Sequence, residues 1–184
     1  MSDIQEFASP ISQPTARSDL LNWRLRPARP IDAAGLRQSC LPHQALEQVD
    51  DLLKRAQKAA RNRRGLSLVA ELTDGTLIGF GQLTLWSRVA EISDVIVGER
   101  WRGQGVGSAI IRRLLDAARE MAVSRAEIGV ALRNVRALQL YRRLGFQTGH
   151  TIELDLGDGP EPVLVMEMDL TAAPPPDAPE PHPA

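Results

Sequence analysis

The stretch "DVIVGERWRGQGVGSAII", residues 94–111, joins an apolar, strand-like segment to an apolar helical pattern through three closely spaced glycines. Gly103, Gly105 and Gly107 alternate with other residues directly before that pattern. Glycine loses more backbone freedom on folding than any other residue, so three at a helix start indicate a backbone that something approaches closely. The first turn of a helix has unpaired N–H groups and a partial positive charge, which together favour a phosphate group.

Two common nucleotide-binding motifs do not fit this turn. The dinucleotide fingerprint G-x-G-x-x-G needs a third glycine where Ser108 stands, and a Walker A loop needs a lysine that is absent here. Two interpretations therefore remain open from the spacing alone. The turn is a phosphate site made of backbone amides, with Arg102 as a charged donor at its rim, or it is a tight strand-to-helix turn without a ligand.

The segments on either side alternate between strand and helix patterns. We expect Asp32 to cap the first helix and Asn134 the last, with Gly145 ending the last helix and Asp74–Gly75 forming a hairpin turn. Strands are predicted at 23–28, 66–72, 77–86, 89–97, 126–132, 146–156 and 163–170, and helices at 33–40, 46–64, 107–118 and 135–144. This order predicts one mixed α/β (α+β) domain at residues 22–171, with a central, mostly antiparallel sheet of about seven strands and about four flanking helices.

Composition narrows the class of protein. With 43% hydrophobic residues in 184, the chain can bury a sizeable core, and a net charge of -1 argues against a general nucleic-acid binder. The single cysteine, Cys40, and three scattered histidines predict neither a disulfide nor a metal site. Residues 1–21 and the proline-rich residues 172–184 are expected to be loose tails. Neither a secretory signal nor a membrane span is expected, which favours a cytoplasmic location.

Two blocks of this sequence resemble the GNAT superfamily of N-acetyltransferases. The family's acyl-CoA motif is Arg or Gln, two residues, Gly, one residue, and Gly or Ala, which Arg102, Gly105 and Gly107 satisfy. The second block is an Asn followed seven residues later by a Tyr and then Leu-Gly-Phe, which Asn134, Tyr141 and residues 144–146 satisfy. The resemblance covers roughly residues 22–171. It implies the GNAT fold and transfer of acetyl from acetyl-CoA to a primary amine by direct attack in a ternary complex. A non-catalytic acyl-CoA-binding or sensing domain of the same fold is the alternative.

The resemblance also implies how acetyl-CoA is held. Its pyrophosphate would lie on the amides of the glycine turn, and its pantetheine arm would pair with the strand ending at Val97, where that strand splays from the strand containing Val130. A main-chain N–H near Val97 would face the thioester carbonyl and act as an oxyanion hole. The residues implied for this binding are Val95, Ile96, Val97, Arg102, Gly103, Gln104, Gly105, Val106, Gly107, Ser108 and Asn134.

Proton transfer needs a base for the amine and an acid for the departing thiolate. Glu91 is the first candidate base, with an outward-facing strand residue as the alternative interpretation; Asp94, Glu127 or a water relay could take the role instead. Tyr141, the only tyrosine, is the candidate acid, and its alternative is a buried core aromatic. The acceptor stays open among a protein amine, a polyamine, an antibiotic amine and an amino acid. Homodimers are common in the family, and no metal, nucleic-acid or membrane partner is expected.

Overall fold

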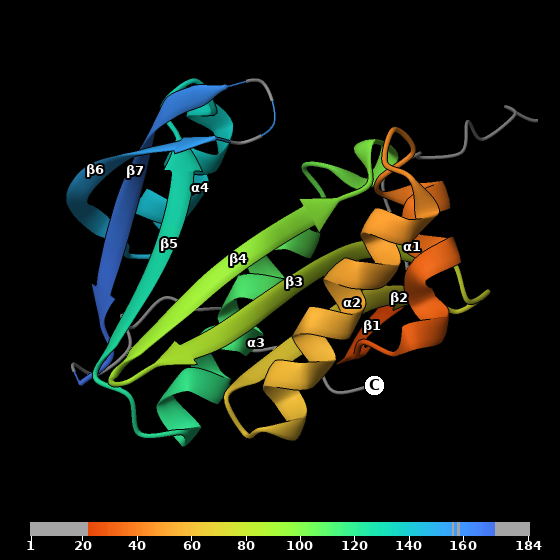
Figure 1. The fold of residues 1–184 in the computed structure, drawn as a ribbon, viewed down its shortest axis with the longest axis horizontal. Helices are drawn as coiled ribbons and strands as arrows, with labels where there is room; N and C mark the ends of the chain where they lie inside the picture. The colour runs from red at the N-terminus through yellow and green to blue at the C-terminus, as the bar shows by residue number, and fades with distance from the viewer. Residues whose placement is uncertain (1–21, 156, 158, 172–184) are drawn as a thin grey trace, which may run out of the picture.

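The computed structural model describes residues 22–155, 157 and 159–171, so the two expected tails, Leu156 and Asp158 lie outside the described residues. Seven strands form one sheet in the order β1-β2-β3-β4-β5-β7-β6 (Figure 1). Their bounds are β1 Trp23–Pro27, β2 Gly65–Leu72, β3 Leu77–Trp86, β4 Val89–Val97, β5 Arg125–Ala131, β6 Gln147–Asp155 and β7 Pro160–Asp169. Five of the neighbouring pairs are antiparallel, and β4 with β5 is the parallel one. The predicted fold class is confirmed.

Four α-helices flank the sheet, and two short 3₁₀ helices lead into α1 and the glycine turn. The α-helices are α1 Ala33–Ser39, α2 Leu46–Arg61, α3 Val106–Glu120 and α4 Val135–Arg143, and the 3₁₀ helices are η1 Pro30–Asp32 and η2 Glu99–Trp101. Every predicted strand and helix is present, with bounds shifted by at most three residues. Within the described ranges, no helix has both the length and the apolar character that crossing a bilayer requires.

Two hydrophobic cores lie on opposite faces of the sheet. One packs α1 and α2 against β2 and β3, with Phe80 fully buried at its centre. The other packs α3 and α4 against the opposite face, around Ile110 and Met166. Glycines let α3 come close to β3, because a Cβ at Gly81 would lie only 2.6 Å from a side-chain carbon of Ile110. This close contact sets how near α3 packs to β3.

Three of the predicted turn and cap residues act as expected. The Asn134 side chain accepts a hydrogen bond from Ala137 N–H at 3.1 Å and so caps α4. Gly145 has φ 97° just after α4, and Gly75 has φ 86° in the hairpin between β2 and β3. Those backbone conformations suit glycine because they lie in the left-handed region.

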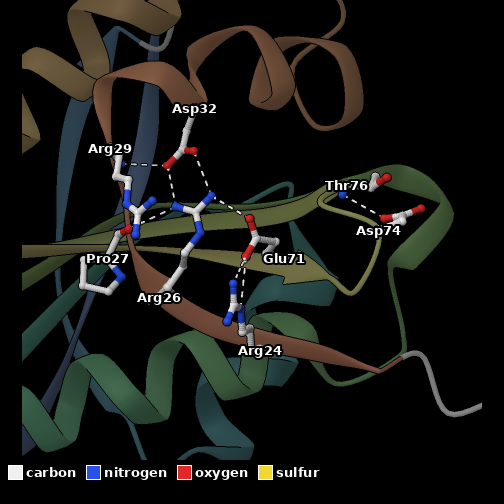
Figure 2. Close-up of polar contacts among 8 residues, drawn as sticks. All are labelled: Arg24, Arg26, Pro27, Arg29, Asp32, Glu71, Asp74 and Thr76. Atoms are coloured by element: carbon white, nitrogen blue, oxygen red, sulfur yellow. Dashed lines mark hydrogen bonds and ion pairs between the residues drawn. The ribbon is translucent and has the colours of Figure 1, made fainter.

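The prediction for Asp32 was wrong, because its carboxylate does not cap α1. Figure 2 shows that the carboxylate instead faces Arg29, at the start of η1, and Arg26, near the end of β1. It accepts a hydrogen bond from Arg29 N–H at 2.7 Å and forms a two-point ion pair with the Arg26 guanidinium at 2.8 and 2.9 Å. Asp32 is only 5% exposed. For a buried carboxylate, a charge-assisted contact with a nearby guanidinium is stronger than a capping hydrogen bond from a backbone N–H. The Asp32 carboxylate is therefore not available to cap α1.

Glu71 of β2 completes this group, which we call the ion-pair network: Arg24, Arg26, Asp32 and Glu71. Glu71 binds Arg26 and Arg24, each at 2.9 Å. The hydrogen bonds from Arg26 and Arg24 lower the pKa of Glu71 to about 2, and the same contacts with Asp32 and Glu71 raise the pKa of Arg26. The network ties η1 and the start of α1 to the first two strands of the sheet.

Candidate active site

The gap between β4 and β5 is the central feature of the candidate site. The two strands pair only over residues 89–92 and 125–128, and beyond Ile92 and Ile128 they have no ladder contact. Figure 1 shows them diverging, with β4 staying beside β3 and β5 following β7. The predicted splay of the strand ending at Val97 is therefore present. It leaves strand edges facing the gap, and such edges can pair with an extended ligand as with another strand.

The backbone of Val97 points into this gap. Gly98 N–H donates to Ile78 C=O on β3 at 3.0 Å. Because backbone groups of successive strand residues point to opposite edges, the N–H of Val97 faces away from β3. The Val97 carbonyl agrees with this orientation, since it accepts a hydrogen bond at 3.2 Å from Nε of Arg102 in the turn that follows.

A β-bulge at Asp94 changes which side chains at the end of β4 face α3. The register passes from Gln82↔Ser93 to Phe80↔Ile96, so β4 has one more residue than β3 there. Asp94 has φ 51°, and its carboxylate accepts a hydrogen bond from the Gln82 side chain at 2.6 Å. The extra residue reverses the alternation of side chains. Ala90 and Ile92 face α3 before the bulge, and Val95 and Val97 face it afterwards.

The glycine turn lies at the wide end of the gap. Gly103 and Gly105 have φ 82° and 85°, and Gly105 is the N-cap of α3. A Cβ at Gly105 would meet no atom within 4 Å. The first α-helical bond runs from Ala109 N–H to Gly105 C=O, so the N–H groups of residues 106–108 precede it and have no partner within the helix. Gly107 lacks a positive φ, so its conformation does not require glycine.

Two other residues of the turn hold its shape. Gln104 donates from its side chain to Arg100 C=O at 3.0 Å, and Arg102 binds Val97 as described above. The turn thus presents backbone donors beside open space, which matches the shape and charge of a phosphate group. The phosphate site is the interpretation that we take up in the proposal below.

Tyr141 lies on α4, on the β5 side of the gap. It is 7% exposed, and its ring centroid is 6.1 Å from that of Phe146. Burial raises the pKa of Tyr141 to about 12, so the phenol keeps its proton at neutral pH. Among the residues described, its hydroxyl has no hydrogen-bond partner, yet it is not one of the fully buried unpartnered atoms. The proton therefore remains free for a ligand.

The three candidate bases lie on the sheet face opposite α3. Glu91 and Glu127 are direct register partners across β4 and β5, at the closed end of the gap. Glu91 accepts a hydrogen bond at 2.6 Å from the indole N–H of Trp86, whereas Glu127 forms an ion pair with Arg125 at 2.9 Å. Asp94 is held by Gln82 in the bulge. Sequence reasoning missed Trp86; the only signal in the sequence was its position five residues before Glu91, across the turn between β3 and β4.

Cys40 has no place in this arrangement. Its side chain is buried under α1, and burial raises the pKa of the thiol to about 11. A thiol must ionise to act as a nucleophile, so a covalent acyl-cysteine route has no support here.

A profile of the acetyltransferase (GNAT) family matches residues 31–146, which is more than half of the chain, and the chain belongs to that family. One relative is the streptothricin acetyltransferase of Streptomyces lavendulae, 34% identical over 82 residues that span 44% of this chain and 43% of the relative. A thialysine N-epsilon-acetyltransferase of Mus musculus is 28% identical over 146 residues, covering 70% of this chain and 86% of its own. The matches cover 29–64% of the lengths of the first five curated relatives.

Solved structures show the same fold. YncA of Salmonella typhimurium, with its cofactor acetyl-CoA, superposes with a TM-score of 0.64 at 20% identity over 85% of this chain and 98% of that one. An N-acetyltransferase of Staphylococcus aureus Mu50 gives a TM-score of 0.67 at 19% identity, over 81% and 99% of the two chains. At this level of identity the likeness concerns the arrangement of strands and helices alone.

Proposed function

We propose that the chain is an acetyl-CoA-dependent N-acetyltransferase that transfers acetyl to a primary amine by direct attack in a ternary complex. The observation that carries this proposal is the β4–β5 gap, which runs from a carboxylate pair at its closed end to the glycine turn at its open end. Membership of the acetyltransferase (GNAT) family supports acetyl-CoA as the donor. A cytoplasmic location is part of this proposal, and the oligomeric state stays open between a monomer and a homodimer.

The donor would lie along the gap. The pyrophosphate would accept hydrogen bonds from the N–H groups of residues 106–108, and the pantetheine arm would pair with the free edge of β4. The Val97 N–H would then face the thioester oxygen, where negative charge develops during attack. A fixed donor of this kind is typically worth about 3 kcal/mol of barrier. The Asn134 side-chain amide, whose oxygen caps α4, would donate from its nitrogen to the arm.

The proton steps follow from the chemistry of the thioester. The amine nitrogen attacks the carbonyl carbon, and a base takes one proton from the resulting ammonium group. Glu91 is the proposed base, directly or through water, with Glu127 and Asp94 as alternatives. The C–S bond then breaks, and Tyr141 donates its proton to the sulfur, so the products are the acetylamide and the free thiol. Tyr141 regains its proton from solvent.

An amine panel tests the proposal against a non-catalytic acyl-CoA-binding domain. Thiol release from acetyl-CoA would be followed with diamines, amino acids, antibiotic amines and peptides as acceptors. We expect release that depends on both protein and acceptor. Binding of acetyl-CoA with no release for any acceptor would favour the binding domain instead.

The base is tested separately by comparing Glu91→Gln with Glu127→Gln. We expect Glu91→Gln to remove the rise of the rate with pH in the acid range, because a base must be deprotonated to accept a proton. Glu127→Gln should leave that rise in place. The reverse result would transfer the base role to Glu127, and two unchanged profiles would point to Asp94 or water.

A further inference from the structure

We propose that Arg136 of α4 binds a phosphate group of acetyl-CoA at the glycine turn, from the opposite side of the gap. This inference rests on the proposed function for the identity of the ligand. It adds a side chain that neither sequence motif contains. The first motif consists of residues of the glycine turn, and the second contributes Asn134 and Tyr141 from the α4 segment.

The position of Arg136 carries the inference. A guanidinium nitrogen, Nη2, lies 3.0 Å from the place that a Cβ on Gly103 would occupy. Gly103 belongs to the turn that follows β4, whereas Arg136 belongs to α4, which follows β5. Because β4 and β5 share no ladder contact beyond Ile92 and Ile128, this approach spans the gap at its open end.

The charge of Arg136 has no partner within residues 22–155, 157 and 159–171. Among the residues that the structure describes, Arg136 forms no ion pair and no hydrogen bond. Arg133, three residues earlier, instead pairs with Glu161 at 2.7 Å. A guanidinium placed against a backbone rather than a carboxylate stays available for an anion. Its planar fork of N–H donors matches phosphate oxygens in a two-point contact.

The surrounding turn supplies the rest of an anion site. The N–H groups of residues 106–108 and the positive end of the α3 dipole lie just beyond Gly103. The space beside Gly105 is open. A side chain at position 103 would have to adopt φ 82°, and its Cβ would press closely against the Arg136 guanidinium. Glycine there lets the cation lie directly over the backbone, so turn and guanidinium can face one phosphate from two sides.

The test compares Arg136→Gln with the wild type, using acetyl-CoA titrated by calorimetry. We expect Arg136→Gln to weaken acetyl-CoA binding about tenfold or more, as loss of a charge-assisted hydrogen bond does. The salt dependence of binding should also become shallower, which a merely structural role would not produce. Arg136→Lys should recover part of the affinity. Arg142→Gln is the matched control, because Arg142 is exposed on the same helix but points about 120° away.

Acetyl-dephospho-CoA distinguishes the two phosphate sources. If the effect of Arg136→Gln disappears with this compound, Arg136 binds the 3′-phosphate; if it persists, Arg136 binds the pyrophosphate. Both results support the assignment. Arg136→Gln binding both compounds as tightly as the wild type would overturn it while leaving the proposed function intact. A wild-type chain that binds neither compound would overturn the proposed function and this assignment with it.

Discussion

The ion-pair network and the β4–β5 gap are two polar regions with opposite character. In the network every charged group has a partner within 3 Å: Asp32 binds Arg26 and the Arg29 backbone, and Glu71 binds Arg26 and Arg24 (Figure 2). Around the gap, the Tyr141 hydroxyl, the Arg136 guanidinium and the first amides of α3 have none among the described residues.

The difference separates polar groups that hold the fold from polar groups that we propose bind a ligand. A satisfied network fixes the geometry of its own elements, here η1 and α1 against the sheet. Unpaired donors around a gap contribute nothing to the fold and are available for binding. The two regions should therefore respond in opposite ways to mutation, with the network changing stability and the gap changing binding and turnover.

Asp32→Ala should give the largest effect on stability. It removes one member of a nearly buried ion pair and leaves Arg26 without its main partner, which typically costs about 3 kcal/mol or more. Urea unfolding would measure the loss. Asp74→Ala is the control, because Asp74 lies in an exposed hairpin and its hydrogen bonds stay within that turn, to Thr76 and its own backbone. If Asp32→Ala unfolded with the wild-type midpoint, the network would not hold the fold.

Tyr141→Phe should give the largest effect on turnover. We expect kcat to fall about 100-fold, the lower range for loss of a general acid, with little change in the KM for acetyl-CoA. The free energy of unfolding should stay the same, because the hydroxyl has no partner to lose in the described part of the chain. Steady-state kinetics and urea unfolding of the same preparation would show this. A stability loss with unchanged kcat would place Tyr141 in the core only.

Gly105→Ala, in the glycine turn, and Gly75→Ala, in the hairpin between β2 and β3, form a matched pair of substitutions. Both glycines have φ near +85°, and a Cβ at either would meet no atom within 4 Å. Each substitution should therefore lower the free energy of unfolding by about 1–2 kcal/mol, because alanine is strained in the left-handed region. Only Gly105→Ala should also raise the KM for acetyl-CoA, by about tenfold, because its open space is the proposed phosphate site. Equal KM values for the two variants would argue against that site.

The smallest expected effect is the response of the network to acid. The pKa of Glu71 is about 2 in the folded chain against an ordinary value of 4.5, so its ionised form stabilises the fold fully above about pH 4.5. That contribution is lost as pH falls toward 2. Urea midpoints at pH 7, 4.5 and 3 would follow it, and Glu71→Gln should weaken the dependence. The effect is modest because Arg24 is 75% exposed and screened by solvent.

The sequence predicted what depends on neighbouring residues. Alternation of apolar side chains located the strands, and the glycine spacing located a turn whose Gly103 and Gly105 do adopt positive φ. Asn134 caps its helix through a contact three residues away. The role of each of these residues depends on residues only a few positions away in the sequence.

Contacts between distant segments were not predictable in the same way. Asp32 was expected to cap a helix, but its carboxylate instead pairs with the Arg26 guanidinium, which Glu71 on another strand also binds. The bulge at Asp94 follows from the register of β4 on β3, and only a break in the apolar alternation hints at it. The approach of Arg136 to the turn depends on how α4 lies across the gap. Such features depend on how segments far apart in the sequence lie in space, which local residue patterns do not show.

The central claim is that the gap and its glycine turn bind acetyl-CoA, and thermal unfolding with and without acetyl-CoA tests it most directly. A ligand present at 100 times its Kd stabilises the fold by about 2.7 kcal/mol, which for a chain of this size corresponds to a rise in Tm of roughly 5–10 °C. We predict a rise of this order with acetyl-CoA, reduced in Gly105→Ala but retained in Gly75→Ala. An unchanged wild-type Tm at millimolar acetyl-CoA would contradict the account.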